Sequence, residues 1–315
     1  MKALIARDYG PVLEIGELPV PQPGPGQIQA RVHAASLNAA DVRLPRGDFR
    51  DHVQVDFPHV PGNDFAGTVT AVGEGVTAYA VGAEIFGHAI PRALRHMAGS
   101  KNPSMTTGTL AQYAVFEADT PFLAHRPSSL DTLMAAALPT AGLTAGALMA
   151  TAGSLRGERV LVIGATGGVG VTVLPLLVRA GARVVATATD TDRQLIADLG
   201  AEPIAYGDYP DGVDTVFNLV LPSDQLADAA RRLRPGGRLY TITFPPPRPE
   251  FIGRDDVRFE LILDVDGTLG GMAEVAGLTT TIGAQYTLDD GVRALADFAD
   301  RHTTGKLVVT IAGGF

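Results

Sequence analysis

The stretch VLVIGATGGVG, residues 160 to 170, passes directly from an apolar run into a cluster of small residues. The apolar half predicts a buried strand, and VGVTVLPLLVRAG, which ends at Gly181, predicts the helix that follows. Ala165, Gly167 and Gly170 stand at the spacing G-x-G-x-x-G, with Ala in the first place. Small residues there let a pyrophosphate approach the backbone, and the helix N-terminus attracts its charge. The stretch therefore predicts a dinucleotide site, although the glycines alone also suit a simple tight turn.

Alternation of strands and helices surrounds this stretch from about residue 125 onward. RVLVIGA, ARVVATAT, DTVFNLVL and GRLYTITF predict strands, and TDRQLIADLGA and SDQLADAARRLRPGG predict helices between them. Strands without polar alternation, separated by helices, are typical of a parallel sheet covered on both faces. This context favours the dinucleotide interpretation of the glycine cluster over the simple turn.

The first 120 or so residues have a different rhythm. IQARVHAASLN and FAGTVTAVGEGV are short β-branched runs between Gly and Pro residues, and GKLVVTIAG predicts one more strand near the C-terminus. A chain of 315 residues also exceeds one ordinary hydrophobic core. We therefore expect an α/β protein with a β-rich domain beside a parallel-sheet domain.

Composition excludes several classes of function. The chain has 25 Lys and Arg against 34 Asp and Glu, a net charge of −9, and no basic run, which disfavours nucleic acid and anionic membranes as partners. The absence of Cys excludes disulfides, thiolate nucleophiles and zinc sites built on sulfur.

Two apolar segments bear on the compartment. MKALIARDYG holds five uncharged residues before Arg7, too few for a signal-peptide core. Residues 132 to 155 carry no charge and are long enough to span a bilayer. They are mostly Ala, Gly and Thr, so we expect a buried helix after a turn rather than a membrane span, and a cytoplasmic protein.

The end of the second strand of the parallel sheet indicates which dinucleotide binds. A site selective for NAD places an acidic residue there to accept from the ribose hydroxyls, but this chain has Ala188. Thr189 and Arg193 follow, and a hydroxyl and a guanidinium suit a 2′-phosphate. The sequence therefore favours NADPH. Asp190 and Asp192 keep NADH open, since either can face the ribose or merely stabilise the next helix N-terminus.

Six motifs in order carry a resemblance to a known family. They are SLNAADVR, PGNDFAGTVTAVGEGVTAYAVGAEIFG, LPTAGLTAG, GATGGVG, LRPGGRL and GKLVVTI. With them the chain resembles zinc-independent medium-chain dehydrogenase/reductases of the quinone oxidoreductase and zeta-crystallin type. The resemblance implies a GroES-like catalytic domain of residues 1–121 and 269–315, a Rossmann NADP-binding domain of residues 122–268, and a homodimer.

The resemblance also implies which residues contact the cofactor. The glycine-rich turn would hold the pyrophosphate, and residues at the ends of the next two strands would contact the adenosine phosphate. Placing Tyr206 there requires a one-residue gap in the alignment of GAEPIAY with the family. The remaining contacts would lie near the centre of the cofactor and at the nicotinamide. Together these residues are Thr144, Ala165, Thr166, Gly167, Gly168, Val169, Gly170, Thr189, Arg193, Tyr206, Asn218, Val220, Thr243 and Phe244.

The departures from the zinc-dependent relatives predict a reaction without metal. Their His-Glu ligand block, G-H-E-x-x-G, reads Gly62-Asn63-Asp64 here, and their Cys ligand falls within Asn38 to Asp41. Alcohol dehydrogenation needs a Lewis acid for its alkoxide and is disfavoured. Quinones and α,β-unsaturated carbonyl compounds are already polarised, so hydrogen-bond donors can stabilise the charge that hydride transfer creates.

Asn38 and Asp41 are the candidate catalytic residues. The amide of Asn38 can donate to a substrate oxygen at any pH, and Asp41 would orient it or the cofactor. Both residues have structural alternatives, since Asn38 can cap a turn and Asp41 a short helix. Arg43 stands where the family often has Tyr, which favours an oxygen-rich or anionic substrate. Residues 88–108 form an uneven insertion, expected to be a mobile loop over the pocket.

Three functions remain open at this point. The leading one is an NADPH-dependent reductase of quinones or activated double bonds. The second is an enoyl reductase acting on a thioester or carrier-bound substrate, which shares every motif. The third is a non-catalytic NADPH-binding protein, because no strict catalytic acid is present.

Overall fold

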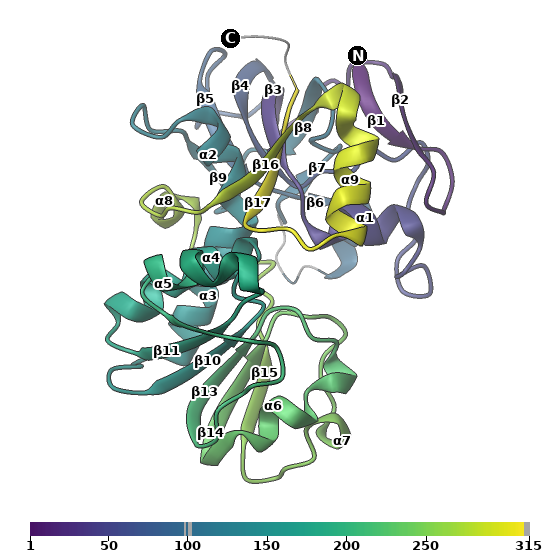
Figure 1. Cartoon of the computed structure of the whole chain (residues 1–315). Coiled ribbons are helices and arrows are strands. Elements are labelled where there is room, and N and C mark those ends of the chain that lie inside the picture. The colour runs from purple at the N-terminus through teal and green to yellow at the C-terminus, as the bar shows by residue number, and fades with distance from the viewer. Residues whose placement is uncertain (98, 100–102, 312–315) are drawn as a thin grey trace. The chain divides into compact units, whose positions relative to one another are not determined.

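The computed structural model describes residues 1–97, 99 and 103–311, and the chain divides into two compact units (Figure 1). Unit 1 consists of Met1–Leu143 and Val265–Phe315, and unit 2 of Thr144–Asp264. The first division lies later in the chain than the expected 121/122, because residues 130–138 pack into unit 1. Ala135, Ala136 and Leu138 are buried there against Phe86 and Val308.

Unit 1 is built mainly from short strands. Its elements are β1 (Lys2–Ala6), β2 (Leu13–Glu17), β3 (Gln27–Ser36), α1 (Ala39–Arg46), β4 (Asp64–Val72), β5 (Glu84–His88), β6 (Ile90–Pro91), η1 (Arg92–Met97), β7 (Met105–Thr106), β8 (Tyr113–Glu117), β9 (Leu123–His125), α2 (Thr132–Ala137), the start of α3 (Pro139–Ala152), α8 (Met272–Val275), β16 (Ile282–Thr287), η4 (Leu288–Asp290), α9 (Gly291–Asp300) and β17 (Lys306–Thr310). The uncharged stretch 132–155 thus contains two helices, α2 and α3, and not one continuous helix. Among the described residues, no helix combines the length and apolarity needed to cross a membrane.

The large sheet of unit 1 is mostly antiparallel, and both of its faces are covered. Its order is β6-β7-β8-β3-β4-β5-β9, and β17 joins it by pairing with β3. Because side chains alternate along a strand, Ala34, Ala66 and Phe86 face α2, whereas Ala35 and Phe65 belong to the core beneath α9. This β-rich unit confirms the expected GroES-like domain.

The expected loop of residues 88–108 is partly ordered into β6, η1 and β7. Ala93 and Leu94 of η1 pack with Leu44 of α1 in a small apolar cluster. The remainder of the expected mobile stretch includes residues 98 and 100–102, which lie outside the described residues.

Unit 2 contains the parallel sheet. Its elements are the rest of α3, β10 (Arg159–Ile163), α4 (Gly168–Arg179), β11 (Arg183–Thr187), η2 (Asp190–Asp192), α5 (Arg193–Asp198), β12 (Glu202–Ile204), β13 (Val213–Asn218), η3 (Ser223–Gln225), α6 (Ala227–Arg231), β14 (Leu233–Thr241), α7 (Pro249–Ile252) and β15 (Arg258–Leu261). The strand order β12-β11-β10-β13-β14-β15, with every pair parallel, is that of a doubly wound dinucleotide-binding sheet.

Helices cover both faces of this sheet (Figure 1). Val160 and Val162 pack with α3, α4 and α5, whereas Leu161 and Ile163 pack with α6 and α7. Every β10 residue from 160 to 163 is fully buried, which explains why the strand shows no polar alternation in the sequence. The Rossmann prediction is confirmed.

One helix predicted for unit 2 differs in part from the structure. The helix expected over SDQLADAARRLRPGG forms only as η3 and α6, and β14 already begins at Leu233. Arg234, Pro235 and the glycines that follow lie in that strand, where Val213 pairs with Leu233 and Thr215 with Arg238 across an irregular register. Two short strands, β12 and β15, were not expected from the sequence.

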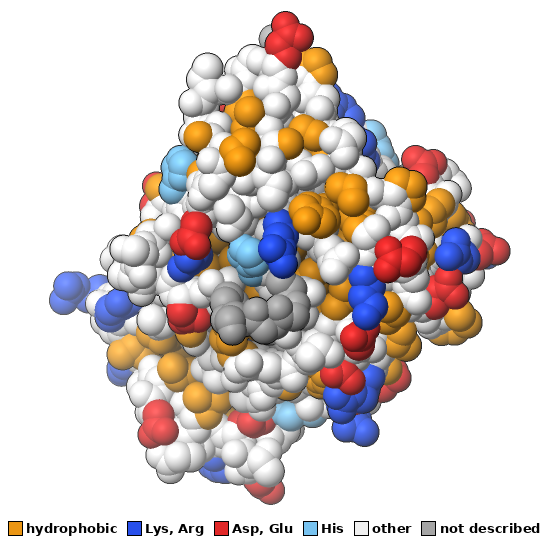
Figure 2. Space-filling model, turned by 90° about the horizontal axis from the view of Figure 1, so that it is seen from above, with side chains coloured by type: hydrophobic (Ala, Val, Ile, Leu, Met, Phe, Trp, Pro, Cys, Tyr) orange, Lys and Arg blue, Asp and Glu red, His pale blue; other side chains and the backbone are white. Residues whose placement is uncertain are grey.

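Charge on the surface is mixed. On the face shown in Figure 2, Lys and Arg side chains stand beside Asp and Glu or apart from one another. Ion pairs of unit 1 join such opposite charges, among them Lys2–Asp289 and Arg293–Asp290.

Candidate active site

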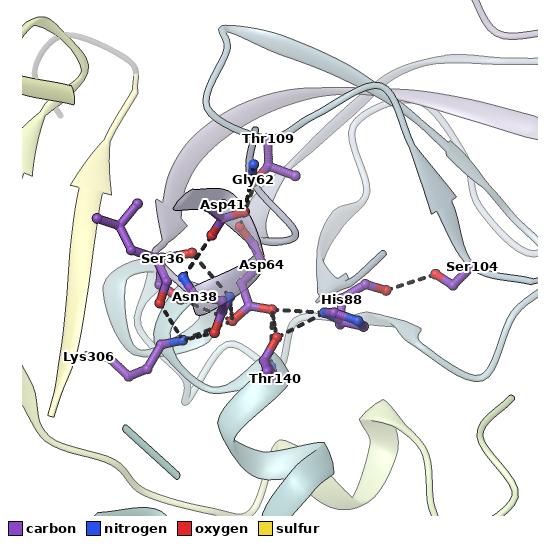
Figure 3. Close-up of polar contacts among 11 residues, drawn as sticks. Ser36, Asn38, Asp41, Gly62, Asp64, His88, Ser104, Thr109, Thr140 and Lys306 are labelled. Carbon is purple, nitrogen blue, oxygen red and sulfur yellow. Dashed lines mark hydrogen bonds and ion pairs between the residues drawn. The ribbon is translucent and has the colours of Figure 1, made fainter. Parts of the chain in front are cut away.

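Strand register gathers a polar cluster at one end of the sheet in unit 1. Ser36 on β3 pairs with Asp64 on β4, and Asp64 pairs with His88 on β5. Each lies two residues from an apolar residue that faces α2, so the three side chains share that face. Lys306 begins β17, two residues before Val308, which pairs with Ser36. Figure 3 shows these side chains converging on the Asp64 carboxylate.

Asp64 is fully buried and its two oxygens each have three partners. Oδ2 accepts from Ser36 Oγ at 3.1 Å and from Asn38 Nδ2 at 2.9 Å, and it lies 3.2 Å from Lys306 Nζ. Oδ1 accepts from the backbone N and Oγ1 of Thr140, at 3.1 and 2.6 Å, and lies 3.2 Å from His88 Nδ1. Burial alone raises the pKa of Asp64, but the Lys306 ammonium, the His88 ring and the Thr140 hydroxyl outweigh it and hold the pKa well below its usual range.

Lys306 is almost as buried as Asp64, with 4% of the residue exposed. Its Nζ donates to Leu37 O at 3.0 Å, to Asn38 Oδ1 at 2.6 Å and to Asp64 Oδ2 at 3.2 Å. An ammonium has three protons, so these contacts use all of its donors.

Asn38 is the N-cap of α1, where it forms a capping box with Asp41 at the third helical position. Its amide also bridges Lys306 and Asp64, and the residue remains partly exposed. Asp41 supports the same turn, because its Oδ2 accepts from the Asn38 backbone N at 2.7 Å and its Oδ1 from Gly62 N at 2.9 Å (Figure 3). Asn38 therefore belongs both to the helix start and to the polar cluster, and Asp41 holds the Asn38 backbone as part of the capping box.

Asp41 should make stability depend on pH. Burial raises the pKa of this carboxyl to about 7, despite the two backbone donors and with a further contribution from Asp64. A raised carboxyl pKa stabilises the fold most at a pH below the unfolded value near 4, and this contribution is lost as the pH rises toward 7. Each pKa unit corresponds to about 1.4 kcal/mol, so we expect a loss of a few kcal/mol.

Denaturant unfolding of the protein and of Asp41→Asn, compared across this pH range, checks the expectation. The wild type should lose stability relative to the variant as the pH rises. Asp119→Asn, at an exposed position of unit 1, is the control for the same chemical change. A difference between wild type and Asp41→Asn that is constant over the range would contradict the assignment.

The donor set of the cluster does not fit zinc. Asn63 and Asp64 occupy the place of the His-Glu ligands, but Asp64 has both oxygens engaged and a buried ammonium beside it. A metal cation would have to displace Lys306 from the only carboxylate of that block. Among the described residues, no group of three or more His, Cys, Asp and Glu side chains is arranged to hold a metal ion.

In unit 2, the turn after β10 fits a dinucleotide phosphate. Gly164, not Ala165, makes the sharp exit from the strand, with φ at +86°. At Gly170 an added Cβ would lie 2.3 Å from Ala165 O, so only glycine lets α4 pack this closely. At Gly167, its chain neighbours aside, an added Cβ would meet only Gly164 O among the described residues, at 3.6 Å, so the space beside the first turn of α4 is open. The N–H groups of that turn, at Gly168, Val169 and Gly170, have no partner within the helix and suit a pyrophosphate. Thr166, in the turn before them, is buried.

The end of β11 places the residues expected at the adenosine phosphate. Thr189 Oγ1 donates to Asp192 Oδ2 at 2.6 Å, so this buried carboxylate faces Thr189. Arg193 is exposed at the first position of α5 and donates from Nη2 to Pro203 O at 3.0 Å. Tyr206 is 44% exposed just after β12.

The strand ends expected at the nicotinamide lie at the same carboxyl edge of the sheet. Asn218 is fully buried, and its amide donates to Leu221 O and to Thr241 Oγ1 at 2.9 Å each. Its neighbours Val220 and Thr243 are the accessible ones, and Val220 is 51% exposed. Phe244 follows Thr243 and is half-buried, and Thr144, on α3, is half-buried as well.

Sequence reasoning missed part of the polar cluster. Thr140 lies within the motif LPTAGLTAG, which gives it no individual role, yet it begins α3 against Asp64 and its Oγ1 lies 2.9 Å from His88 Nδ1. The sequence places Lys306 only in a terminal strand. At Arg43, where the family often has Tyr, the guanidinium lies over the Phe49 ring at 4.4 Å and beside Asp48.

The fold and these two sites define a two-domain dinucleotide-dependent oxidoreductase. Residues 24–127 match the family model described as alcohol dehydrogenase GroES-like domain, and residues 180–309 match the one described as zinc-binding dehydrogenase. The chain belongs to the medium-chain dehydrogenase/reductase superfamily, and it is similar to the members of quinone oxidoreductase type.

Three curated relatives illustrate the similarity. An NADPH-dependent alkenal/one oxidoreductase of Arabidopsis thaliana is 32% identical over 80% of this chain, and the match spans 64% of that protein. A chloroplast envelope quinone oxidoreductase homolog of the same plant is 28% identical, over 98% of each chain. A phthioceranic/hydroxyphthioceranic acid synthase of Mycobacterium tuberculosis is 31% identical over 92% of this chain but only 14% of its own length.

Two solved structures share the fold over nearly the whole chain. The quinone oxidoreductase from Coxiella burnetii has a TM-score of 0.81 and 26% identity, covering 99% of each chain. A mycobacterial protein complexed with NADPH has a TM-score of 0.82 and 27% identity, covering 98% of this chain and 99% of its own.

Proposed function

We propose that the protein is a zinc-independent, NADPH-dependent reductase of quinones or α,β-unsaturated carbonyl compounds. The observation that carries the proposal is the Asn38 amide, held as a hydrogen-bond donor in a cluster whose residue types do not fit zinc. NADPH is supported by the turn at Gly167–Gly170 and by similarity to an NADPH-dependent oxidoreductase and to a protein complexed with NADPH.

The residues of each unit would have separate tasks. Bound along Gly167–Gly170, Thr189 and Arg193, with Val220 and Thr243 at the other end, NADPH supplies a hydride. In unit 1, Asn38 Nδ2 donates one proton to Asp64, and its second proton, which has a long contact of 3.5 Å to Ser36 O, would donate to a substrate oxygen. An enone or quinone that has accepted a hydride carries negative charge on that oxygen, so this donor bonds the charged product form more strongly than the substrate.

Steady-state oxidation of NADPH with 1,4-benzoquinone, with a simple enone and with a crotonyl thioester tests the proposal. We expect turnover with the quinone or the enone. Tight binding of NADPH with no turnover on any of the three would instead support a non-catalytic NADPH-binding protein. A kcat/KM for oxidation of an alcohol with NADP⁺ that exceeds the kcat/KM for reduction of every one of these acceptors would also contradict the proposal.

An enoyl reductase acting on a thioester is the second candidate. Its support is the similarity to a segment of an acid synthase, which spans 92% of this chain. A crotonyl thioester reduced with a kcat/KM well above that of the enone would favour this candidate.

Arg193 is expected to set the preference for NADPH. Its exposed guanidinium is available to a 2′-phosphate, and a hydrogen bond to a charged group contributes about 1.5–3 kcal/mol. Arg193→Ala should therefore weaken NADPH roughly ten- to hundredfold and leave NADH nearly unchanged. The chain has no Trp, so nicotinamide fluorescence can be titrated directly.

Arg183→Ala is the matched control, because it removes the same charge at the opposite end of β11. It should change neither affinity. Equal weakening of NADPH and NADH by Arg193→Ala would refute the phosphate assignment.

The oligomeric state and the compartment complete the proposal. A homodimer is supported only by the resemblance to the family, and a cytoplasmic location only by the lack of Cys, which excludes disulfides. Sedimentation velocity of the purified protein tests the first, and localisation of a tagged copy the second.

A further inference from the structure

The side chains of Lys306, Asn38 and Asp64 form a closed ring of three contacts. Lys306 Nζ donates to Asn38 Oδ1 at 2.6 Å, Asn38 Nδ2 donates to Asp64 Oδ2 at 2.9 Å, and Lys306 Nζ lies 3.2 Å from the same Asp64 oxygen (Figure 3). The cation and the anion are both buried, so neither is screened by water.

This ring permits only one orientation of the amide. In the reverse orientation, Asn38 Oδ1 would face the Asp64 carboxylate and the NH₂ group would face the Lys306 ammonium, two repulsive contacts in place of two charge-assisted ones. Within the described part of the chain, the second proton of Asn38 Nδ2 has only one partner, Ser36 O, at the long distance of 3.5 Å. The ring therefore leaves one N–H of a partly exposed residue free to donate.

We infer that Lys306 is a positioning residue that orients and polarises the Asn38 amide as the donor for the substrate oxygen. A cation on the amide oxygen draws electron density from the nitrogen and strengthens the remaining N–H as a donor. Lys306 itself has no proton left to donate to the substrate, since all three are used within the cluster. The inference rests on the reductase function proposed above.

The competing explanation is that Lys306 only neutralises Asp64. Two variants separate the two roles. Lys306→Met removes the donor and leaves Asp64 uncompensated, whereas Lys306→Met combined with Asp64→Asn removes both charges and restores neutrality in the buried cluster. In both, Asn38 Oδ1 loses its ammonium partner. Lys306→Arg retains a cation and donors, and Lys2→Met is the control for loss of a surface lysine of unit 1.

Steady-state kinetics with NADPH and the best acceptor of the panel is the main measurement. We expect kcat and kcat/KM to fall ten- to hundredfold in Lys306→Met, with Kd for NADPH unchanged, because only an interaction of the charged product form is lost. The double variant should regain thermal stability but not kcat, and Lys306→Arg should regain part of kcat. A stable double variant with wild-type kcat would overturn the inference.

An NMR readout keeps the test independent of turnover. The side-chain amide signals of Asn38, identified by their absence in Asn38→Asp, should be resolved and slow to exchange in the wild type. In Lys306→Met and in the double variant they should shift and exchange with solvent, while Lys2→Met leaves them in place. If the wild type reduces no acceptor, the proposed function fails, and unchanged Asn38 signals in both Lys306 variants would separately refute the positioning role.

Discussion

Replacement of Gly170 by Ala should abolish binding of NADPH. The new Cβ would lie 2.3 Å from the Ala165 carbonyl oxygen, 2.4 Å from its carbon and 2.6 Å from its Cα. These atoms are backbone, so the only relief is to push α4 away from the turn after β10. The N–H groups of the first helical turn would then move away from where they meet a pyrophosphate. We expect a loss of affinity of at least a hundredfold, measured by nicotinamide fluorescence, together with a lower thermal midpoint.

Gly146→Ala is the control for this change. Gly146 also lies in a helix of unit 2, and beyond its chain neighbours and its own helix backbone no atom of the described residues stands within 4 Å of its added Cβ. Ala is the better helix former by up to about 1 kcal/mol, so this variant should bind NADPH normally and be no less stable. Normal NADPH binding by Gly170→Ala would show that the turn does not form the phosphate site.

Asp64→Ala should strongly destabilise unit 1. It leaves the buried Lys306 ammonium uncompensated, and it removes acceptors for Ser36, Asn38 and Thr140. Removing one partner of a buried ion pair typically costs about 3–5 kcal/mol. Denaturant unfolding near neutral pH measures the loss.

The pH dependence of this loss has a definite sign. Because the pKa of Asp64 is held below its usual value, its contribution is present above about pH 4 and disappears as the pH falls further. Adding Lys306→Met should recover much of the stability lost in Asp64→Ala, whereas Glu14→Ala, at an exposed pair with Arg7, should change little. A double variant no more stable than the single one would show that the charge on Lys306 is not the source of the loss.

The parallel-sheet unit could be predicted from sequence because its signals are local. A buried strand, a glycine turn and a helix follow one another within residues 159–179, so periodicity and turn chemistry suffice. The exception shows the limit of such signals. Residues 231–234 are good helix formers, but pairing of Leu233 and Arg238 with β13 draws the chain into a strand from Leu233 onward.

The polar cluster of unit 1 was only partly predictable. Asn38, Asp41 and Asp64 stand in motifs with a family pattern, so the sequence identifies them. It does not identify Lys306, because 242 residues separate it from Asp64 and no local pattern connects them. What unites them is the pairing of β17 with β3, a long-range contact that periodicity does not reveal.

The strand β17 also has a consequence for biosynthesis. Asp64 emerges from the ribosome early, whereas the lysine that neutralises it emerges only after unit 2 has been made. Until then the Asp64 carboxylate lacks the Lys306 ammonium as its partner, so the sheet of unit 1 cannot bury Asp64 in its final form. All of unit 2, by contrast, is contiguous and can fold as soon as Asp264 leaves the exit tunnel. The nascent chain should therefore acquire a nucleotide-binding module before it acquires the site that uses the nucleotide.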